Sequence, residues 1–191
     1  MSGDRASEPA RIEGAEVRNL RHLTDERGSF AETYRREWLP AGAREMVQSN
    51  LSRSKAGVLR GMHYHRQQAD YWVVMEGRAF VALFDLRRGS PTEGERDELE
   101  MDGEAPTGLY VPPGVAHGFC ARADLSLLYL VDDYYRTPDP DEHGIAWDDP
   151  GLGIGWPVTD PVLSDRDRSN PPLAAALAEP PDWVDRPAGR A

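Results

Sequence analysis

Short strand-like segments dominate this chain and limit its fold more than any other feature. Runs rich in β-branched and aromatic residues occur at 71–75, 77–86, 107–121 and 125–135, and turn clusters such as RRGSPTEGE and RTPDPDEHG separate them. The middle of the chain has no long segment with the 3.6-residue period of an amphipathic helix. Many short strands with regular turn signals predict an all-β sandwich or barrel, and the double-sheet jelly roll is one such arrangement.

Both ends of the chain are expected to be peripheral parts of a single domain spanning 1–191. Residues 1 to about 14 are polar, lack the apolar core of a signal peptide and are interpreted as a loose leader. Residues 170–191 are rich in Pro and Ala and predict a surface tail with one short helix at 172–178. The segment 33–43 could hold another helix, which a Pro and a Gly would end.

The charge balance argues against some classes of partner. The chain carries 33 acidic and 22 basic residues, a formal net charge of -11. Such a field repels nucleic acid and anionic membranes, so neither is an expected partner, whereas an anionic small ligand can still bind where arginines gather. Cys120 is the only cysteine, so no internal disulfide forms, and no apolar run approaches the ~20 residues that span a bilayer. The expectation is a soluble cytoplasmic protein.

Three of the five histidines fall in or beside predicted strands. Residues two apart in a strand point to the same face, so His63 and His65 share a face. His117 follows the turn PPGVA, which leads into the next strand. These two segments can lie side by side in a jelly roll, and all three imidazoles could then enter one barrel. The spacing predicts a site in the barrel interior without deciding its chemistry.

Several longer motifs run in one order along about three quarters of the chain. They are DERGSFAETY (25–34), QSNLSRSKAGVLRGMHYH (48–65), FDLRRGSPTEGE (84–95), VPPGVAHGF (111–119), LLYLVDDYY (127–135), IAWDDPGLGIGWP (145–157) and LSDRD (163–167). With them the chain resembles the dTDP-4-dehydrorhamnose 3,5-epimerase family of nucleotide-sugar enzymes. The resemblance implies an all-β cupin fold, a double-stranded β-helix (jelly roll) with short flanking helices.

The resemblance also implies a reaction. The family removes protons from carbons beside the 4-keto group of a dTDP-hexose and returns them from the other face. Such chemistry needs a base, an acid opposite it and a group that holds the enolate oxygen. His63 matches the base, Asp167 the carboxylate that orients it, and Tyr129 the acid. His117 matches a second active-site histidine.

Substrate contacts follow from the same resemblance. Four residues match positions that contact the diphosphate or the sugar: Arg27, Gln48, Asn50 and Arg60. Three match positions on or near the thymine base: Phe30, Tyr135 and Glu32. In the family, part of this pocket comes from a partner subunit, so the resemblance implies a homodimer that binds a dTDP-linked keto-deoxysugar and needs no cofactor.

Two residues depart from the family pattern. Asp70 stands where family members carry a lysine that holds the enolate oxygen, and His65 stands where they usually carry a glutamine-type residue. A carboxylate would oppose the negative charge that develops on that oxygen. The lost lysine therefore weighs against ordinary double epimerisation and allows a single-site or altered reaction.

The same stretch fits a metal-binding pattern found among cupins. Its ligands would be His63, His65, Asp70 and His117, a set that suits a divalent transition metal. A ligated imidazole cannot serve as a free base, so this alternative and the epimerase prediction exclude each other at His63. A combined alternative uses the metal as a Lewis acid on the 4-keto oxygen, with Tyr129 or a metal-bound water as the base.

The leading prediction is therefore a dTDP-4-keto-6-deoxyhexose 3- or 3,5-epimerase of a deoxysugar pathway. The alternative is a metal-dependent cupin isomerase or oxygenase. A non-catalytic cupin that binds a nucleotide sugar comes third, because the lost lysine would also suit a binder.

Overall fold

The structure, a computed structural model, describes residues 8–136 and 141–182. Residues 1–7 of the expected leader and 183–191 of the expected tail lie outside the described residues. No helix in the described part of the chain is long and apolar enough to cross a membrane.

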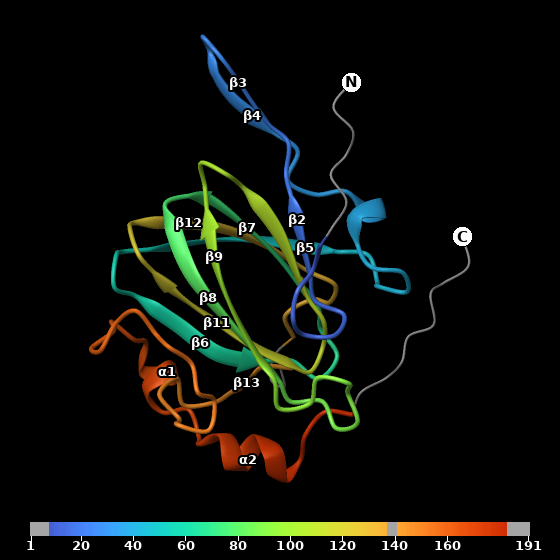
Figure 1. The fold of residues 1–191 in the computed structure, drawn as a ribbon, viewed down its shortest axis with the longest axis vertical. Helices are drawn as coiled ribbons and strands as arrows, with labels where there is room; N and C mark the ends of the chain where they lie inside the picture. Colours follow the sequence, from blue (N-terminus) through green and yellow to red (C-terminus); the bar gives the residue numbers. More distant parts are fainter. Residues whose placement is uncertain (1–7, 137–140, 183–191) are drawn as a thin grey trace.

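Two antiparallel sheets face each other around a common interior (Figure 1). The first has the order β1-β2-β10-β7-β12-β5. Its strands are β1 (Glu8–Pro9), β2 (Glu16–Asn19), β10 (Thr107–Val111), β7 (Asp70–Glu76), β12 (Leu125–Val131) and β5 (Gln48–Ser54). The second has the order β13-β6-β11-β8-β9. Its strands are β13 (His143–Gly144), β6 (Leu59–Tyr64), β11 (Val115–Ala121), β8 (Arg78–Asp85) and β9 (Arg96–Asp102). This arrangement confirms the predicted jelly roll.

A separate hairpin and three short helices complete the described fold. The hairpin, β3 (His22–Asp25) with β4 (Gly28–Ala31), projects away from the barrel (Figure 1). The helical turns are η1 (Arg36–Trp38), α1 (Asp165–Arg168) and α2 (Leu173–Ala178). The helix suggested within 33–43 is reduced to η1, because Leu39 precedes Pro40 and is held in extended geometry with ψ 150°.

Strand alternation builds two apolar layers on the second sheet. Ala79, Val81 and Leu83 of β8 face the core between the sheets. Their neighbours Ala82 and Phe84 face a second cluster. That outer cluster includes Leu173 and Ala176 of α2, so part of the tail packs against the barrel. Ile12, within the expected leader, is fully buried in the core between the sheets.

A buried ion pair organises the turn that contains the SPTEG motif. Asp85 accepts hydrogen bonds from Nε of Arg87 at 2.8 Å, from Oγ of Ser90 at 2.6 Å and from Oγ1 of Thr92 at 2.7 Å. Burial alone would raise the pKa of Asp85, but these hydrogen bonds outweigh it and hold the pKa below its ordinary value. The Ser and Thr of the SPTEG motif are therefore explained as hydrogen-bond partners of the buried Asp85 carboxylate.

We expect Asp85→Ala to lower the free energy of unfolding by about 3–5 kcal/mol, because it leaves the Arg87 guanidinium buried without its partner. Since the pKa of Asp85 is lowered in the folded state, its contribution is complete above the unfolded pKa of about 3.9. It is lost as the pH falls through the lower, folded value. Denaturant titrations at neutral pH and at successively lower pH measure both effects.

The matched control is Asp160→Ala, which removes an exposed carboxylate. It should change the free energy of unfolding by less than about 0.5 kcal/mol. Equal effects of the two substitutions would contradict the role given to Asp85.

Candidate active site

Strand alternation places polar side chains at one end of the barrel interior. Asp70 shares a face of β7 with Trp72, and Trp72 belongs to the core between the sheets. His117 lies between Val115 and Phe119 on β11, and both of these neighbours belong to the same core. Asp70 and His117 therefore point inward, and both side chains are almost fully buried.

β6 and β11 approach closely beside these residues. His63 is the cross-strand partner of His117. Gly61, two residues before His63, has φ +126°, and a Cβ on it would lie 2.6 Å from Cα of Gly118. Only glycine is compatible with that backbone geometry and that approach. The glycines of RGMHYH and AHGF thus allow the two histidine-bearing strands to meet.

His63 is bonded to a carboxylate from outside the sheets. Its Nε2 lies 2.6 Å from Oδ1 of Asp167 in α1. Asp167 also accepts the hydroxyl hydrogen bond of Ser164 at 2.9 Å. Burial alone would raise the pKa of Asp167, but the bonds from His63 and Ser164 and the charge of nearby Arg166 lower it. An ionised carboxylate only accepts, so Nε2 of His63 carries the proton and Nδ1 is left as the basic nitrogen.

His65, Asp70 and His117 form a second, separate cluster. One ligand atom from each lies within 4.8 Å of the other two. Nε2 of His65 is 3.8 Å from Oδ1 of Asp70, and Nε2 of His117 is 3.8 Å from Oδ2. Burial lowers the pKa of His117 to about 4. His63 is not part of this cluster, so the structure brings together three of the four residues of the metal alternative.

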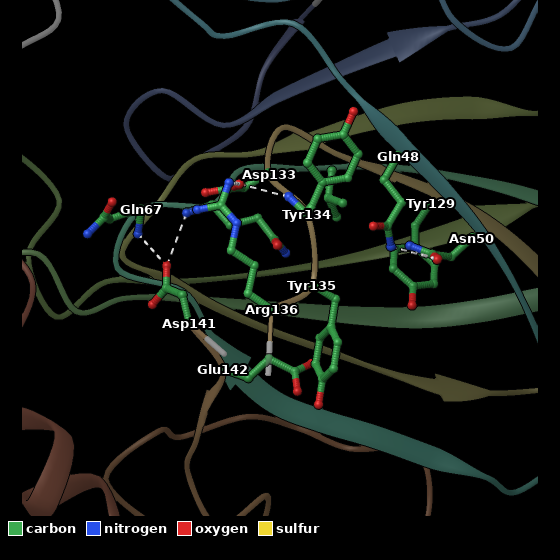
Figure 2. Close-up of a pocket in the computed structure, with 12 residues that line it drawn as sticks. Gln48, Asn50, Gln67, Tyr129, Asp133, Tyr134, Tyr135, Arg136, Asp141 and Glu142 are labelled. Carbon is green, nitrogen blue, oxygen red and sulfur yellow. Dashed lines mark hydrogen bonds and ion pairs between the residues drawn. The ribbon is translucent and has the colours of Figure 1, made fainter. Parts of the chain in front are cut away.

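A pocket of about 400 Å³ includes in its lining Gln68, which donates to Asp70, but none of the three cluster residues. Figure 2 shows its lining, which reaches from Gln48, Asn50 and Tyr129 to Arg136, Asp141 and Glu142. Nε2 of Gln48 donates to Oδ1 of Asn50 at 3.0 Å. Burial, first, and the charge of Asp70, second, raise the pKa of Tyr129. Tyr129 is thus a protonated phenol between the pocket and the buried carboxylate.

The other expected substrate contacts divide into two groups. Tyr135 lines the pocket beside Glu142 (Figure 2). Arg60 is exposed and donates to Oγ of Ser54 at 3.0 Å, outside the pocket lining.

Arg27, Phe30 and Glu32 lie on or just after the projecting hairpin. Arg27 pairs with Asp25 at 2.6 Å, Glu32 pairs with Arg35, and Phe30 is 65% exposed. One chain therefore does not bring these three residues to its own pocket.

Some residues of the site were not found from the sequence. Asp141 accepts the backbone N–H groups of Arg66, Gln67 and Gln68, and its own carbonyl accepts a hydrogen bond from Nδ1 of His65. Trp72 and Gln68 donate to Asp70, each at 3.0 Å. The only sequence signal for Trp72 is its position two residues after Asp70 in a strand. Asp141 acts across a loop, and spacing gives no signal for it.

We expect Asp141→Ala to loosen the loop that follows His65. Hydrogen bonds to charged groups contribute about 1.5–3 kcal/mol, so exchange of the amides of 66–68 should accelerate roughly 10- to 100-fold. Hydrogen–deuterium exchange followed by NMR measures this. Glu142→Ala, which removes the neighbouring carboxylate but none of these bonds, should leave the amides of 66–68 protected. Unchanged exchange in both variants would contradict the proposed anchoring.

Comparison with known proteins places this geometry in a family. The family model described as dTDP-4-dehydrorhamnose 3,5-epimerase matches residues 9–175. A Neisseria gonorrhoeae protein of that name is 40% identical over 160 residues, which are 81% of this chain and 48% of the relative's length. The chain thus spans about half of that relative.

Two solved structures share the fold at higher coverage. A Legionella pneumophila 3,5-epimerase in complex with dTDP-4-keto-L-rhamnose has a TM-score of 0.83 and 34% identity, covering 93% of this chain and 98% of that one. The 3'-monoepimerase ChmJ of Streptomyces bikiniensis, in complex with dTDP-quinovose, has a TM-score of 0.82 and 35% identity, covering 91% and 92%. The chain belongs to the dTDP-4-dehydrorhamnose 3,5-epimerase family.

Proposed function

We propose that this chain epimerises a dTDP-4-keto-6-deoxyhexose by removing and returning a proton on a carbon beside the 4-keto group. The observation that carries the proposal is the His63–Asp167 pair, held at 2.6 Å. Tyr129 lines the pocket, whereas His63 and Asp167 are not among its lining residues. The Legionella relative in complex with a dTDP-4-keto sugar supports the substrate class. The reaction moves protons and transfers no hydride, so it needs no redox cofactor.

In this proposal Nδ1 of His63 is the base. Imidazole has an ordinary pKa near neutrality, which suits the removal of a carbon-bound proton at physiological pH. Asp167 fixes the tautomer through its bond to Nε2 and stabilises the imidazolium that forms. The low pKa of Asp167 keeps this carboxylate ionised throughout.

Tyr129 is proposed as the acid that returns a proton. Its raised pKa keeps the phenol protonated at neutral pH. Its side chain lines the pocket on the wall formed with Gln48 and Asn50, so a bound sugar can reach it (Figure 2). His117, buried next to His63, is proposed to complete the site from the interior.

The nucleotide is proposed to bind between two chains of a homodimer. Arg27, Phe30 and Glu32 lie on or next to a hairpin that extends away from its own barrel (Figure 1). Leu23 and Phe30 on this hairpin are exposed at 45% and 65%. Exposed apolar side chains on a projecting arm suit insertion into a second copy of the chain. The partner's barrel would then supply Gln48, Asn50, Arg60 and Tyr135.

A cytoplasmic location is part of the proposal. The single cysteine, Cys120, is free and buried, which suits a reducing compartment.

Two substitutions test the roles of the acid and of the base's partner, each with a matched control. Tyr129→Phe is compared with Tyr64→Phe, and Asp167→Asn with Asp165→Asn. We expect the substitutions at 129 and 167 to slow solvent deuterium incorporation roughly 10²- to 10⁴-fold, the usual contribution of a general acid or base. Tyr64 packs in the outer cluster and Asp165 is exposed on α1, so their variants should keep the wild-type rate. NMR of a dTDP-4-keto-6-deoxyhexose in D₂O measures the rates.

The same spectra locate the reacting carbon. Deuterium at C3 alone identifies a mono-epimerase, and deuterium at C3 and C5 a double epimerase. No deuterium at either carbon with wild-type protein would reject the proposed activity and leave a binder.

Mixing two inactive variants tests the shared pocket. In a heterodimer of Phe30→Ala with Asp167→Asn, one site combines an intact barrel with the partner's intact hairpin. We therefore expect the mixture, after subunit exchange, to recover part of the activity that each variant lacks alone. Light scattering should give twice the 21.3 kDa chain mass. No recovery in a mixture that does exchange subunits would show that each hairpin serves its own barrel.

A further inference from the structure

We propose that His65, Asp70 and His117 bind one divalent transition-metal ion, and that this ion holds the negative charge that develops on the keto oxygen of the substrate. The catalytic half of this inference rests on the proposed epimerase function, whereas the binding half stands on geometry alone.

The two histidines present unprotonated nitrogens to the same carboxylate. Nδ1 of His117 donates to the carbonyl of Val115 at 3.0 Å, and Nδ1 of His65 donates to the carbonyl of Asp141. A carbonyl oxygen only accepts, so in the neutral rings both Nε2 atoms carry lone pairs. Each faces one oxygen of Asp70 at 3.8 Å, which is too long for a hydrogen bond. With both rings neutral, two lone pairs and a carboxylate converge on one space, whereas a proton on either ring would make an ion pair with Asp70.

The two imidazole–carboxylate separations are compatible with one shared metal ion, and the ligand atoms of the two histidines lie within 4.8 Å of each other. Imidazole and carboxylate ligands lie about 2.0–2.2 Å from a divalent ion such as zinc, so two ligands of one ion can be up to about 4.2 Å apart. The two 3.8 Å separations lie inside that limit. Two histidines and one carboxylate also leave coordination positions for a non-protein ligand.

The surroundings match those of a metal site. Metal-binding histidines usually donate their second ring N–H to a carbonyl or carboxylate, as His65 and His117 both do. Asp70 is fixed by N–H donors from Trp72 and Gln68, each at 3.0 Å. All three side chains of the cluster are less than a tenth exposed. A buried carboxylate without a cationic partner is costly, and a metal ion or a proton on one of the two histidines removes that cost.

The ion and the base do not compete for the same side chain. His63 is held by Asp167 and stands outside the cluster, so it is free to act as the base. Lys55, the only lysine, is exposed and paired with Asp124 at 2.6 Å. The chain therefore has no ammonium group at the site, and a metal ion would supply the missing positive charge.

The proton transfers balance with the ion in this role. The proton leaves carbon for Nδ1 of His63, and the C–H electron pair moves through a new carbon–carbon double bond onto the keto oxygen. The ion stabilises this oxygen while it is negative. Tyr129 then gives a proton to the same carbon, which restores the ketone and leaves tyrosinate. Solvent returns a proton to Tyr129 as His63 releases its own.

Cobalt binding tests the site directly. We expect the chelator-treated full-length protein to bind one equivalent of Co²⁺ per chain, with visible d–d absorption bands and a rise in Tm. Asp70→Asn and His65→Gln should each weaken binding at least tenfold. Trp72→Phe removes the N–H donor to Asp70 and part of the ring that packs against His117 and Phe119, and should weaken binding roughly 10- to 100-fold. His22→Gln, on the hairpin, should bind like wild type.

Three outcomes decide the inference. Wild-type protein that binds no Co²⁺, or binds it no better than Asp70→Asn, overturns the site; a proton on one histidine would then neutralise Asp70. Equal deuterium incorporation by chelated and Co²⁺-loaded protein overturns the catalytic role and leaves the epimerase proposal intact. One bound Co²⁺ with no incorporation in either form supports the site and rejects the epimerase proposal.

Discussion

Ionised side chains inside this barrel must be paired, and the rest of the structure depends on how that requirement is met. Asp70, Asp85, Asp132 and Asp167 are all buried. Asp85 closes the turn after β8 with Arg87, and Asp132 holds Arg44 and the backbone N–H of Ala69. Asp167 takes the proton-bearing nitrogen of His63. Asp85 and Asp132 are each paired with an arginine and Asp167 with His63, whereas the hydrogen-bond donors to Asp70 are the neutral side chains of Trp72 and Gln68.

The strands could be predicted from the sequence because alternation and turn residues are local signals. The same alternation correctly places His117 in the interior, between Val115 and Phe119. The helix suggested at 33–43 is replaced by the single turn η1, because the residue before Pro40 is forced into extended geometry. Alternation also holds for His63 and His65: Met62 and Tyr64 pack in the outer cluster, and both histidines lie on the opposite face, next to His117.

The candidate site could be predicted only in part, because several of its residues come together from distant parts of the sequence. His63 and Asp167 are 104 residues apart, so only the family resemblance could pair them before the structure brought α1 against β6. Asp141 accepts hydrogen bonds from backbone N–H groups of the loop at 66–68, and no pattern of side chains in the sequence predicts such bonds. The residues of the hairpin match a nucleotide pocket in sequence but lie away from the barrel of their own chain (Figure 1).

Because His63 lies outside the cluster of His65, Asp70 and His117, proton removal by His63 and metal binding no longer exclude each other. Spacing alone put His63 and His65 on one face, and a metal bound by both would have removed the base. In the structure Asp167 draws Nε2 of His63 toward α1, while the carbonyl of Asp141 turns Nε2 of His65 toward Asp70. Residues two apart thus serve different partners. A base at His63 and an ion bound at the cluster would then use different side chains on neighbouring strands, and proton removal beside a ketone requires both a base and an electrophile.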